Sequence, residues 1–124
     1  MIQRVSKFKA ERQARYRRGL ASEYLAAALL MAKGYRILAR RYQASAGEID
    51  LIACRGRRLV FVEVKQRLTL QDCEASVTSN QRARVRRAAD QWLAHQPNYR
   101  AHDITFDVIF LTPRRWPRHL MNAL

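Results

Sequence analysis

Two stretches of the chain place apolar residues at the three-to-four spacing that buries one side of an amphipathic helix. The first stretch, from Leu20 to Lys33, has this spacing at Leu20, Tyr24, Ala27, Ala28 and Met31. Gly34 is well placed to end that helix. The second stretch, from Val77 to His95, has it at Val85, Ala88, Ala89, Trp92 and Leu93, after Thr78 and Ser79 as candidate N-caps. The pattern therefore predicts two helices.

Four other segments favour β-strands, because they are rich in β-branched and apolar residues. The strands are expected at residues 35–43, 47–54, 58–65 and 104–111. Gly56 separates the second from the third, which predicts a hairpin. The last segment is almost continuously apolar, as expected of a strand buried on both faces, and its one acid, Asp107, is expected to serve folding through an ion pair. Pro113 and Pro117 mark a final irregular segment.

The order of these elements is helix, three strands, helix, strand, which predicts an α/β fold with a mixed sheet flanked by helices. The final strand, helix, strand succession requires a right-handed crossover, which sets the last strand parallel to the third. At 124 residues the chain is long enough for one such domain. We expect that single domain to span residues 19–124.

Residues 1–18 are expected to form a mobile basic arm. They hold seven cations and one acid, Glu11, with few apolar residues to anchor them. An arginine-rich leader is also typical of organellar transit peptides, but the single serine, Ser6, weakens that alternative.

No apolar run reaches the roughly 20 residues of a membrane-spanning helix, so a soluble, cytoplasmic protein without a membrane partner is expected. Cys54 and Cys73 lack the spacing of a zinc site and are expected to be free thiols.

The charge balance points to a polyanionic partner. Lys and Arg number 24 against 10 Asp and Glu, which gives a formal net charge of +14 and a pI near 11.2. Nucleic acid is the favoured partner, because cationic side chains gain affinity by displacing condensed counterions from phosphates. Acidic lipid surfaces come second, and a charge that serves solubility alone is the remaining alternative.

The predicted hairpin brings four ionisable side chains together. If residues 56–57 form a two-residue type II′ turn, Asp50 lies directly opposite Glu63. The same register places Glu48 opposite Lys65, and the alternation of side chains puts all four on one face. Directly opposed Cβ atoms lie about 4.5–5.5 Å apart, close enough for two carboxylates to share one divalent cation. The alternative is a ladder of Glu and Lys on a solvated sheet face.

Two short motifs in this hairpin resemble a known family. Residues 47–52 (Gly-Glu-Ile-Asp-Leu-Ile) and 61–65 (Phe-Val-Glu-Val-Lys) resemble the YraN-like family of small bacterial proteins. The resemblance covers nearly all of the chain after the basic arm. It implies a restriction-endonuclease-like αβββαβ core of the PD-(D/E)xK superfamily. In that superfamily, the residues matching Asp50 and Glu63 bind Mg²⁺ or Mn²⁺, and the one matching Lys65 assists catalysis.

Two further side chains are candidates for the site. Glu23 lies at the edge of the first helix's apolar stripe, and related resolvases carry an acid on this helix that helps to hold metal; the alternative is a boundary glutamate paired with a cation. Gln81 lies on the apolar stripe of the second helix, where its amide would hold a water or a phosphate. The alternative is a polar residue beside the N-caps, and the family usually has a lysine where this chain has Asn80.

Five arginines are candidates for phosphate contacts, with a solvated helix face as the alternative. They are Arg17, Arg18, Arg84, Arg86 and Arg87.

The resulting interpretation is a Mg²⁺- or Mn²⁺-dependent endonuclease that uses metal-activated water and acts on DNA rather than RNA. Similarity to Holliday-junction resolvases adds branched or flapped DNA to the expected substrates. Homodimerisation would allow both strands to be cut. The alternatives are a non-catalytic nucleic-acid-binding protein and a basic RNA–protein assembly factor.

Overall fold

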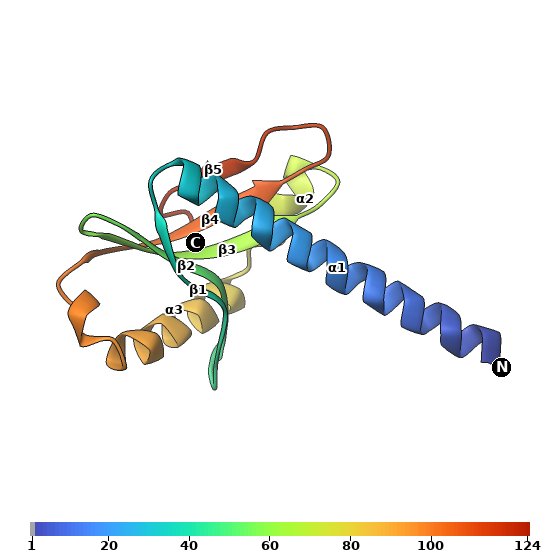
Figure 1. Ribbon diagram of the computed structural model, residues 1–124, viewed down its shortest axis with the longest axis horizontal. Coiled ribbons are helices and arrows are strands. Elements are labelled where there is room, and N and C mark those ends of the chain that lie inside the picture. The colour runs from blue at the N-terminus through green and yellow to red at the C-terminus, as the bar shows by residue number, and fades with distance from the viewer. Residues whose placement is uncertain (1) are drawn as a thin grey trace.

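The computed structural model describes residues 2–124, with side chains from Lys7 onward, as a five-stranded sheet between helices (Figure 1). Its helices are α1 (Ile2–Ala32), α2 (Leu70–Ala75), α3 (Ser79–Ala94) and the 3₁₀ turn η1 (Pro97–Tyr99). Its strands are β1 (Arg36–Ala44), β2 (Gly47–Arg55), β3 (Arg58–Gln66), β4 (Asp103–Leu111) and β5 (Arg118–Leu120). They lie in the order β1-β2-β3-β4-β5, with β3 and β4 parallel and the other neighbours antiparallel. The predicted α/β, restriction-endonuclease-like fold is confirmed.

The first helix is longer than the apolar spacing predicted. It begins at Ile2 instead of Leu20, and its N-terminal half projects past the sheet (Figure 1). Arg, Lys, Gln, Glu and Ala are good helix formers, so these residues extend the helix where no sheet lies beneath it to require an apolar stripe. The division into an arm at residues 1–18 and a domain at 19–124 is therefore not a boundary of secondary structure. The mobility of the arm stays a prediction.

Two short elements were not expected. Helix α2 is short and is capped at its N-terminus by Thr69, whose hydroxyl accepts a hydrogen bond from Asp72 N–H at 3.1 Å. Strand β5 lies in the segment expected to be irregular and adds to β4 through three residue pairs. Both are too short to show a hydrophobic period, so the contacts that form them come from the rest of the fold.

The hairpin of β2 and β3 has the predicted register from Arg55↔Arg58 to Leu51↔Val62. Gly56 has φ +59°, and Arg57 is not among the residues with positive φ, as a type II′ turn requires. Strand β4 then lies parallel to β3, as the crossover through α3 predicted. Three of the four predicted strand segments thus meet in the centre of the sheet.

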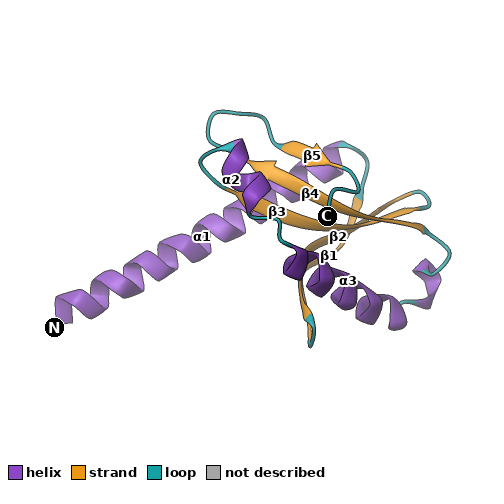
Figure 2. Cartoon of the chain, turned by 180° about the vertical axis from the view of Figure 1, so that it is seen from behind, coloured by secondary structure: helices purple, strands orange, loops and turns teal. Residues whose placement is uncertain are grey.

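Helices α1 and α3 cover opposite faces of the sheet, as the view from behind also shows (Figure 2). The core between the sheet and α3 contains Ile52, Phe61, Val85, Trp92 and Phe110. The core between the sheet and α1 contains Ala27, Leu30, Leu51, Val62 and Ile109. Because side chains alternate along each strand, the central strands supply both cores at once. The free thiols of Cys54 and Cys73 are buried in the domain. None of the helices described in residues 2–124 is long and apolar enough to cross a membrane.

Asp107 joins the last two strands through a hydrogen bond with the imidazole of His119, rather than through an ion pair with a lysine or arginine. Its carboxylate is fully buried, lies 2.7 Å from His119 Nε2 and accepts a hydrogen bond from Asn122 N–H at 2.9 Å. Burial by itself would raise the pKa of Asp107, but the hydrogen bonds from His119 and Asn122 outweigh it and hold the pKa below its usual value. This carboxylate therefore anchors the C-terminal segment.

Candidate active site

Asp50 lies where β2 separates from β3. The last pair of that ladder is Leu51↔Val62, so the predicted direct opposition of Asp50 and Glu63 lies just beyond the paired residues. Instead, Asp50 Oδ2 accepts a hydrogen bond of 2.8 Å from the backbone N–H of Val64. The carboxylate stands in for a strand carbonyl and satisfies an N–H group that the parting strand leaves free. This bond fixes Asp50 at the point where the two strands diverge.

Glu63 is the buried carboxylate of the site, with 8% of its surface exposed. Burial raises its pKa to about 8, and the charge of Asp50 and the hydrogen bond to it add to that rise, while Lys65 opposes it. Lys65 Nζ lies 3.8 Å from Glu63 Oε1 and is itself almost buried. Glu63 therefore keeps its proton at neutral pH unless a cation takes the proton's place.

Gln81 joins the same carboxylate from α3. Its Nε2 donates a hydrogen bond of 3.1 Å to Glu63 Oε1. The helix is started at the predicted N-cap Thr78, whose hydroxyl accepts from the backbone N–H of Gln81 at 3.2 Å. The buried Gln81 Oε1 has no hydrogen-bond partner among the described residues, which leaves an acceptor at the site for a donor from outside the protein.

A small pocket of about 160 Å³ holds these groups between the sheet and α3. It is lined by Glu48, Asp50, Glu63, Gln81, Arg84 and Val85. Glu48 is not opposite Lys65 as predicted, because the β2–β3 ladder ends at Leu51↔Val62. Glu48 pairs with Gln43 of β1, and its Oε1 accepts from Gln43 Nε2 at 3.3 Å. Gly47 lets α3 approach this closely, since a Cβ at that position would lie 3.2 Å from Arg84 Cβ.

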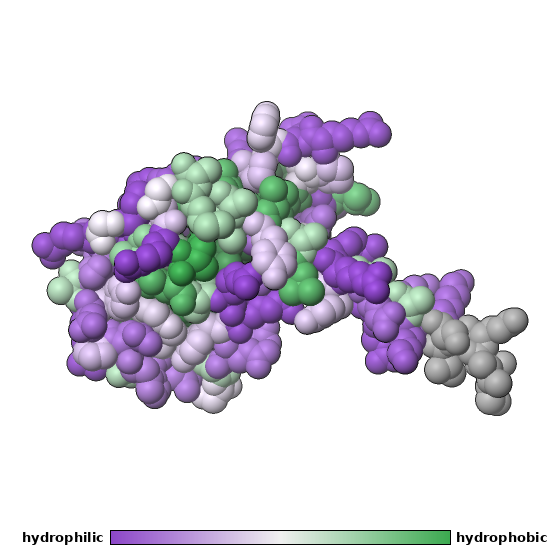
Figure 3. Space-filling view, viewed as in Figure 1, coloured by the Kyte–Doolittle hydropathy of each residue, from purple (hydrophilic) through white to green (hydrophobic). Residues whose placement is uncertain are grey.

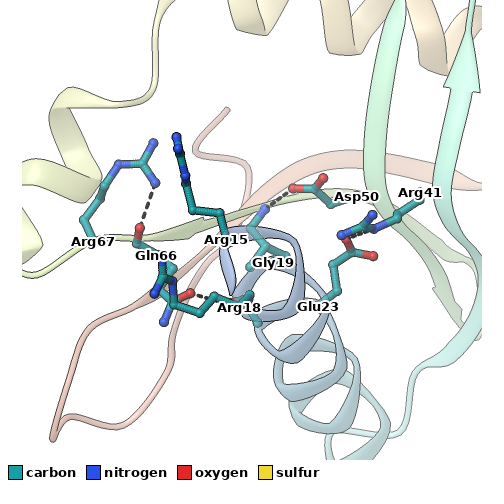
Figure 4. Close-up of a pocket in the computed structure, with 10 residues that line it drawn as sticks. Arg15, Arg18, Gly19, Glu23, Arg41, Asp50, Gln66 and Arg67 are labelled. Carbon is teal, nitrogen blue, oxygen red and sulfur yellow. Dashed lines mark hydrogen bonds and ion pairs between the residues drawn. The ribbon is translucent and has the colours of Figure 1, made fainter. Parts of the chain in front are cut away.

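A larger pocket of about 460 Å³ lies beside α1 (Figure 4). It is lined by Arg15, Arg18, Gly19, Ser22, Glu23, Arg41, Asp50, Val64, Gln66 and Arg67. Asp50 lines both pockets, so the carboxylate site and the arginine-lined pocket meet at this residue. The four arginines that line this pocket give it a positive charge of the kind that binds phosphate groups.

Glu23 is directed to Arg41 within this pocket (Figure 4). The two side chains form an ion pair, and the hydrogen bond to Glu23 raises the pKa of the Arg41 guanidinium. Glu23 is almost buried, with a side chain 10% exposed. Its surroundings match the alternative reading of the sequence, a boundary glutamate paired with a cation.

The predicted phosphate-contacting arginines are distributed unevenly. Arg18 lines the pocket beside α1, and Arg84 lines the pocket beside α3. Arg17 and Arg87 are exposed and line neither pocket. Arg86 packs its guanidinium over Phe106 at 4.5 Å and donates to the carbonyl of Leu124 at 3.1 Å, which ties α3 to the C-terminal tail. Where Figure 3 colours the projecting part of α1, hydrophilic side chains predominate, while hydrophobic ones gather over the body of the domain.

The residues present fit a hard divalent cation held by few protein ligands. Among the residues that the structure describes, no group of three or more His, Cys, Asp and Glu side chains is close enough to hold a metal ion. The adjacent carboxylates of Asp50 and Glu63 remain, together with the unpaired oxygen of Gln81. Mg²⁺ prefers oxygen ligands, retains several waters and is commonly held by one or two carboxylates.

Comparison with known proteins places the chain in a family. The family model described as "Uncharacterised protein family UPF0102" matches residues 22–111. The chain belongs to UPF0102. The YraN-like resemblance of the two motifs fits this assignment. The matched region contains Glu23, Asp50, Glu63, Lys65 and Gln81.

Relatives in the UPF0102 family align over most of the chain. A UPF0102 protein of Methylorubrum extorquens (strain PA1) is 53% identical over 114 residues, which cover 92% of this chain and 89% of the relative. One from Mesorhizobium japonicum is 50% identical, with 92% and 91% covered. One from Rhodopseudomonas palustris (strain BisB5) is 44% identical, with 91% and 86% covered.

Sequence reasoning missed three arginines that this UPF0102 chain brings to the site, Arg15, Arg41 and Arg67. Arg15 shares a helix face with Arg18 and Ser22, but the predicted apolar stripe did not lead to it. Tyr24 and Met31 of that stripe are exposed, so this part of the prediction is wrong; the buried side of α1 holds Ser22, Glu23, Ala26, Ala27 and Leu30. Arg41 has a φ of +51°, a backbone conformation that the sequence does not announce. Arg67 follows the end of β3, so only the placement of α1 brings it near Arg15.

Proposed function

We propose that the protein is a nuclease that hydrolyses phosphodiester bonds in DNA with Mg²⁺ or Mn²⁺. The adjacent carboxylates of Asp50 and Glu63, of which Glu63 is buried, carry this proposal. Such a pair is costly without a positive charge between its members, and Glu63 holds a proton instead. The raised pKa of Glu63 means that this arrangement costs folding stability as the pH rises, and a catalytic or binding role accounts for that cost.

A divalent ion held by the carboxylates of Asp50 and Glu63 would polarise the scissile phosphate and lower the pKa of attacking water. Lys65, with its ammonium close to Glu63, would stabilise the negative charge that develops on the phosphate. The free Gln81 Oε1 would accept a hydrogen bond from the attacking water and orient it.

The arginine-lined pocket beside α1 would hold the substrate backbone next to this centre. Arg15, Arg18 and Arg67 reach it from α1 and from the segment after β3, and Asp50 forms its boundary with the carboxylate site. Guanidinium groups bind phosphates in a bidentate way, so the pocket would fix the register of the strand without reading its sequence.

The test is divalent-metal-dependent cleavage of single-stranded, duplex, flapped and four-way DNA and of RNA. The wild type is compared with Asp50→Asn, which keeps an acceptor for Val64 N–H but removes the charge, and with Lys65→Ala. We expect each variant to lose about 10²- to 10³-fold in rate. The exposed acid Asp90 lies outside both pockets, so Asp90→Asn is the matched control. Equal rates in all four proteins would remove the catalytic assignment.

A non-catalytic nucleic-acid-binding protein is the second candidate. The ion pair of Glu23 with Arg41 favours it, because the acid expected to complete a set of three metal ligands is engaged elsewhere. Under this reading Asp50→Asn and Lys65→Ala bind DNA or RNA like the wild type, and none of the three proteins cleaves it.

A homodimer is proposed only for the nuclease, because two sites would then cut the two strands of a duplex. The mass of the protein in solution, measured with and without DNA, tests it.

A further inference from the structure

Trp116 is the most exposed large hydrophobic side chain of the described residues, at 93%. It lies in the turn between β4 and β5, beside a pocket of about 390 Å³. The pocket is lined by Leu70, Phe110, Thr112, Arg115, Trp116, Pro117 and Arg118. The other tryptophan, Trp92, is 6% exposed and packs edge-on against Phe61. Trp116 therefore offers a free aromatic surface that the core does not use.

This pocket lies one strand away from the candidate active site. Phe110 on its floor pairs with Lys65 in the parallel ladder of β3 and β4. The Phe110 side chain belongs to the core on the α3 side of the sheet, the side on which Gln81 reaches Glu63. The carboxylate pocket and the Trp116 pocket therefore lie on the same side of the sheet, on neighbouring strands.

The lining combines the two chemistries that bind single-stranded nucleic acid. Trp116, Phe110 and Leu70 provide aromatic and apolar surface, and Arg115 and Arg118 provide positive charge at the same pocket. Stacking of an unpaired base on an aromatic side chain contributes affinity whatever the base, while arginines contact the adjoining phosphates. The volume falls in the range of small-ligand pockets, about 300–1,000 Å³.

The turn that carries Trp116 is held in an uncommon backbone conformation. Arg114 has φ +62°, in the left-handed region that side chains other than Gly rarely adopt. Such strain persists where the surrounding structure fixes it, and it is concentrated at ligand-binding segments. The left-handed residue Arg114 lies two positions before Trp116, whose ring is left exposed.

We propose that the pocket of Trp116 binds an unpaired base of the nucleic acid whose backbone lies at the Asp50 site. The proposal rests on the proposed function and narrows its substrate to nucleic acid with a single-stranded segment. In a blunt duplex every base is paired and stacked, so no base can enter this pocket without being flipped out. A base in a single strand or flap enters freely.

The experiment records tryptophan fluorescence during titration with a single-stranded oligonucleotide, with EDTA present so that no cleavage occurs. Trp116→Phe leaves only the buried Trp92 to emit and is the blank. We expect quenching in the wild type, no quenching in the blank, and little change with a blunt duplex. Measured by fluorescence anisotropy of a labelled oligonucleotide, Trp116→Ala should weaken binding about tenfold, and Trp116→Phe should retain most of it, because phenylalanine also stacks.

Tyr24→Ala is the matched control, because Tyr24 is an exposed aromatic residue on α1 that lines neither the Trp116 pocket nor the arginine-lined pocket. It should bind the oligonucleotide like the wild type. Failure of Trp116→Ala to weaken single-strand binding would overturn the proposal, even if the protein cleaves DNA. If the wild type is quenched and Trp116→Ala binds more weakly, but no substrate is cleaved, the base pocket is supported and the proposed nuclease activity is refuted. Emission that shifts with anionic lipid vesicles but not with oligonucleotides would overturn it in favour of a membrane contact.

Discussion

Replacing Glu63 with Gln should remove most of the pH dependence of folding stability near neutrality. Glutamine has the shape of a protonated glutamate. Its Oε1 can still accept from Gln81 Nε2, and its amide can donate to Asp50 as the protonated carboxyl does. The substitution therefore keeps the local hydrogen bonds and removes only the titration.

The sign follows from the raised pKa of Glu63, about 8 in the folded protein against an ordinary 4.5. Between these values the unfolded chain has released the proton that the folded protein still holds. Stability is therefore full below the unfolded pKa and is lost as the pH rises through the folded pKa. With each pKa unit equal to about 1.36 kcal/mol, the wild type should lose on the order of 3 kcal/mol between about pH 5 and pH 8. This is an upper value, because Asp50 shares the titration.

The assay is urea unfolding in EDTA at three pH values across that window, with the midpoint and slope fitted for each protein. Glu63→Gln should be nearly flat with pH and more stable than the wild type at the alkaline end. Asp107 does not interfere, since its pKa is lowered and its contribution is lost only under more acidic conditions. Glu74→Gln, an exposed acid on α2, is the control that should keep the wild-type slope.

Added Mg²⁺ separates a metal site from a merely buried acid. At alkaline pH the ion replaces the proton, so a concentration ten times the dissociation constant should stabilise the wild type by about 1.4 kcal/mol. Glu63→Gln should gain much less, because one of its two carboxylates is gone. Parallel pH slopes in the wild type and Glu63→Gln would refute the reasoning, since they would show that Glu63 titrates as an ordinary surface acid.

Three further predictions concern the residues around the site. Asp107→Ala should lower the free energy of unfolding by about 3–5 kcal/mol in urea titrations, because it removes a fully buried hydrogen-bonded charge, and a loss below about 1 kcal/mol would contradict that role. Arg41→Ala should cost about 1–2 kcal/mol by leaving the Glu23 carboxylate unpaired, and adding Glu23→Gln should restore most of the loss in thermal melts. Gly47→Ala should displace α3, lower the free energy of unfolding by about 1–3 kcal/mol and reduce DNA cleavage. Gly56→Ala, at φ +59° with no atom within 4 Å, should lower the free energy of unfolding without affecting cleavage.

The local pattern of the chain was enough to place the hairpin. The apolar run on each side of Gly56 predicted two strands, and the glycine predicted the turn, so the register from Arg58 to Val62 was correct. These are interactions between near neighbours in the chain, which depend on side-chain alternation and turn geometry alone. The same holds for Thr78 as an N-cap, because capping joins residues only three positions apart.

The sequence did not determine where β2 leaves β3, and this separation decides the geometry of Asp50. A regular ladder would have placed Asp50 across from Glu63; instead its carboxylate binds Val64 N–H and lies between two pockets. Where β2 has left β3, it stays paired with β1 and lies close to α3 at Gly47, and the contact with α3 joins residues far apart in the chain.

The sequence by itself determined the two motifs, the net charge of +14 and the order of the principal elements, because each follows from residue type and spacing. Only the tertiary structure decided which charges meet. It paired Glu23 with Arg41, gathered Arg15 and Arg67 into one pocket, and turned Trp116 outward beside Arg118. The physical reason is that an ion pair or a pocket depends on distances across the sheet, which spacing along the chain does not set.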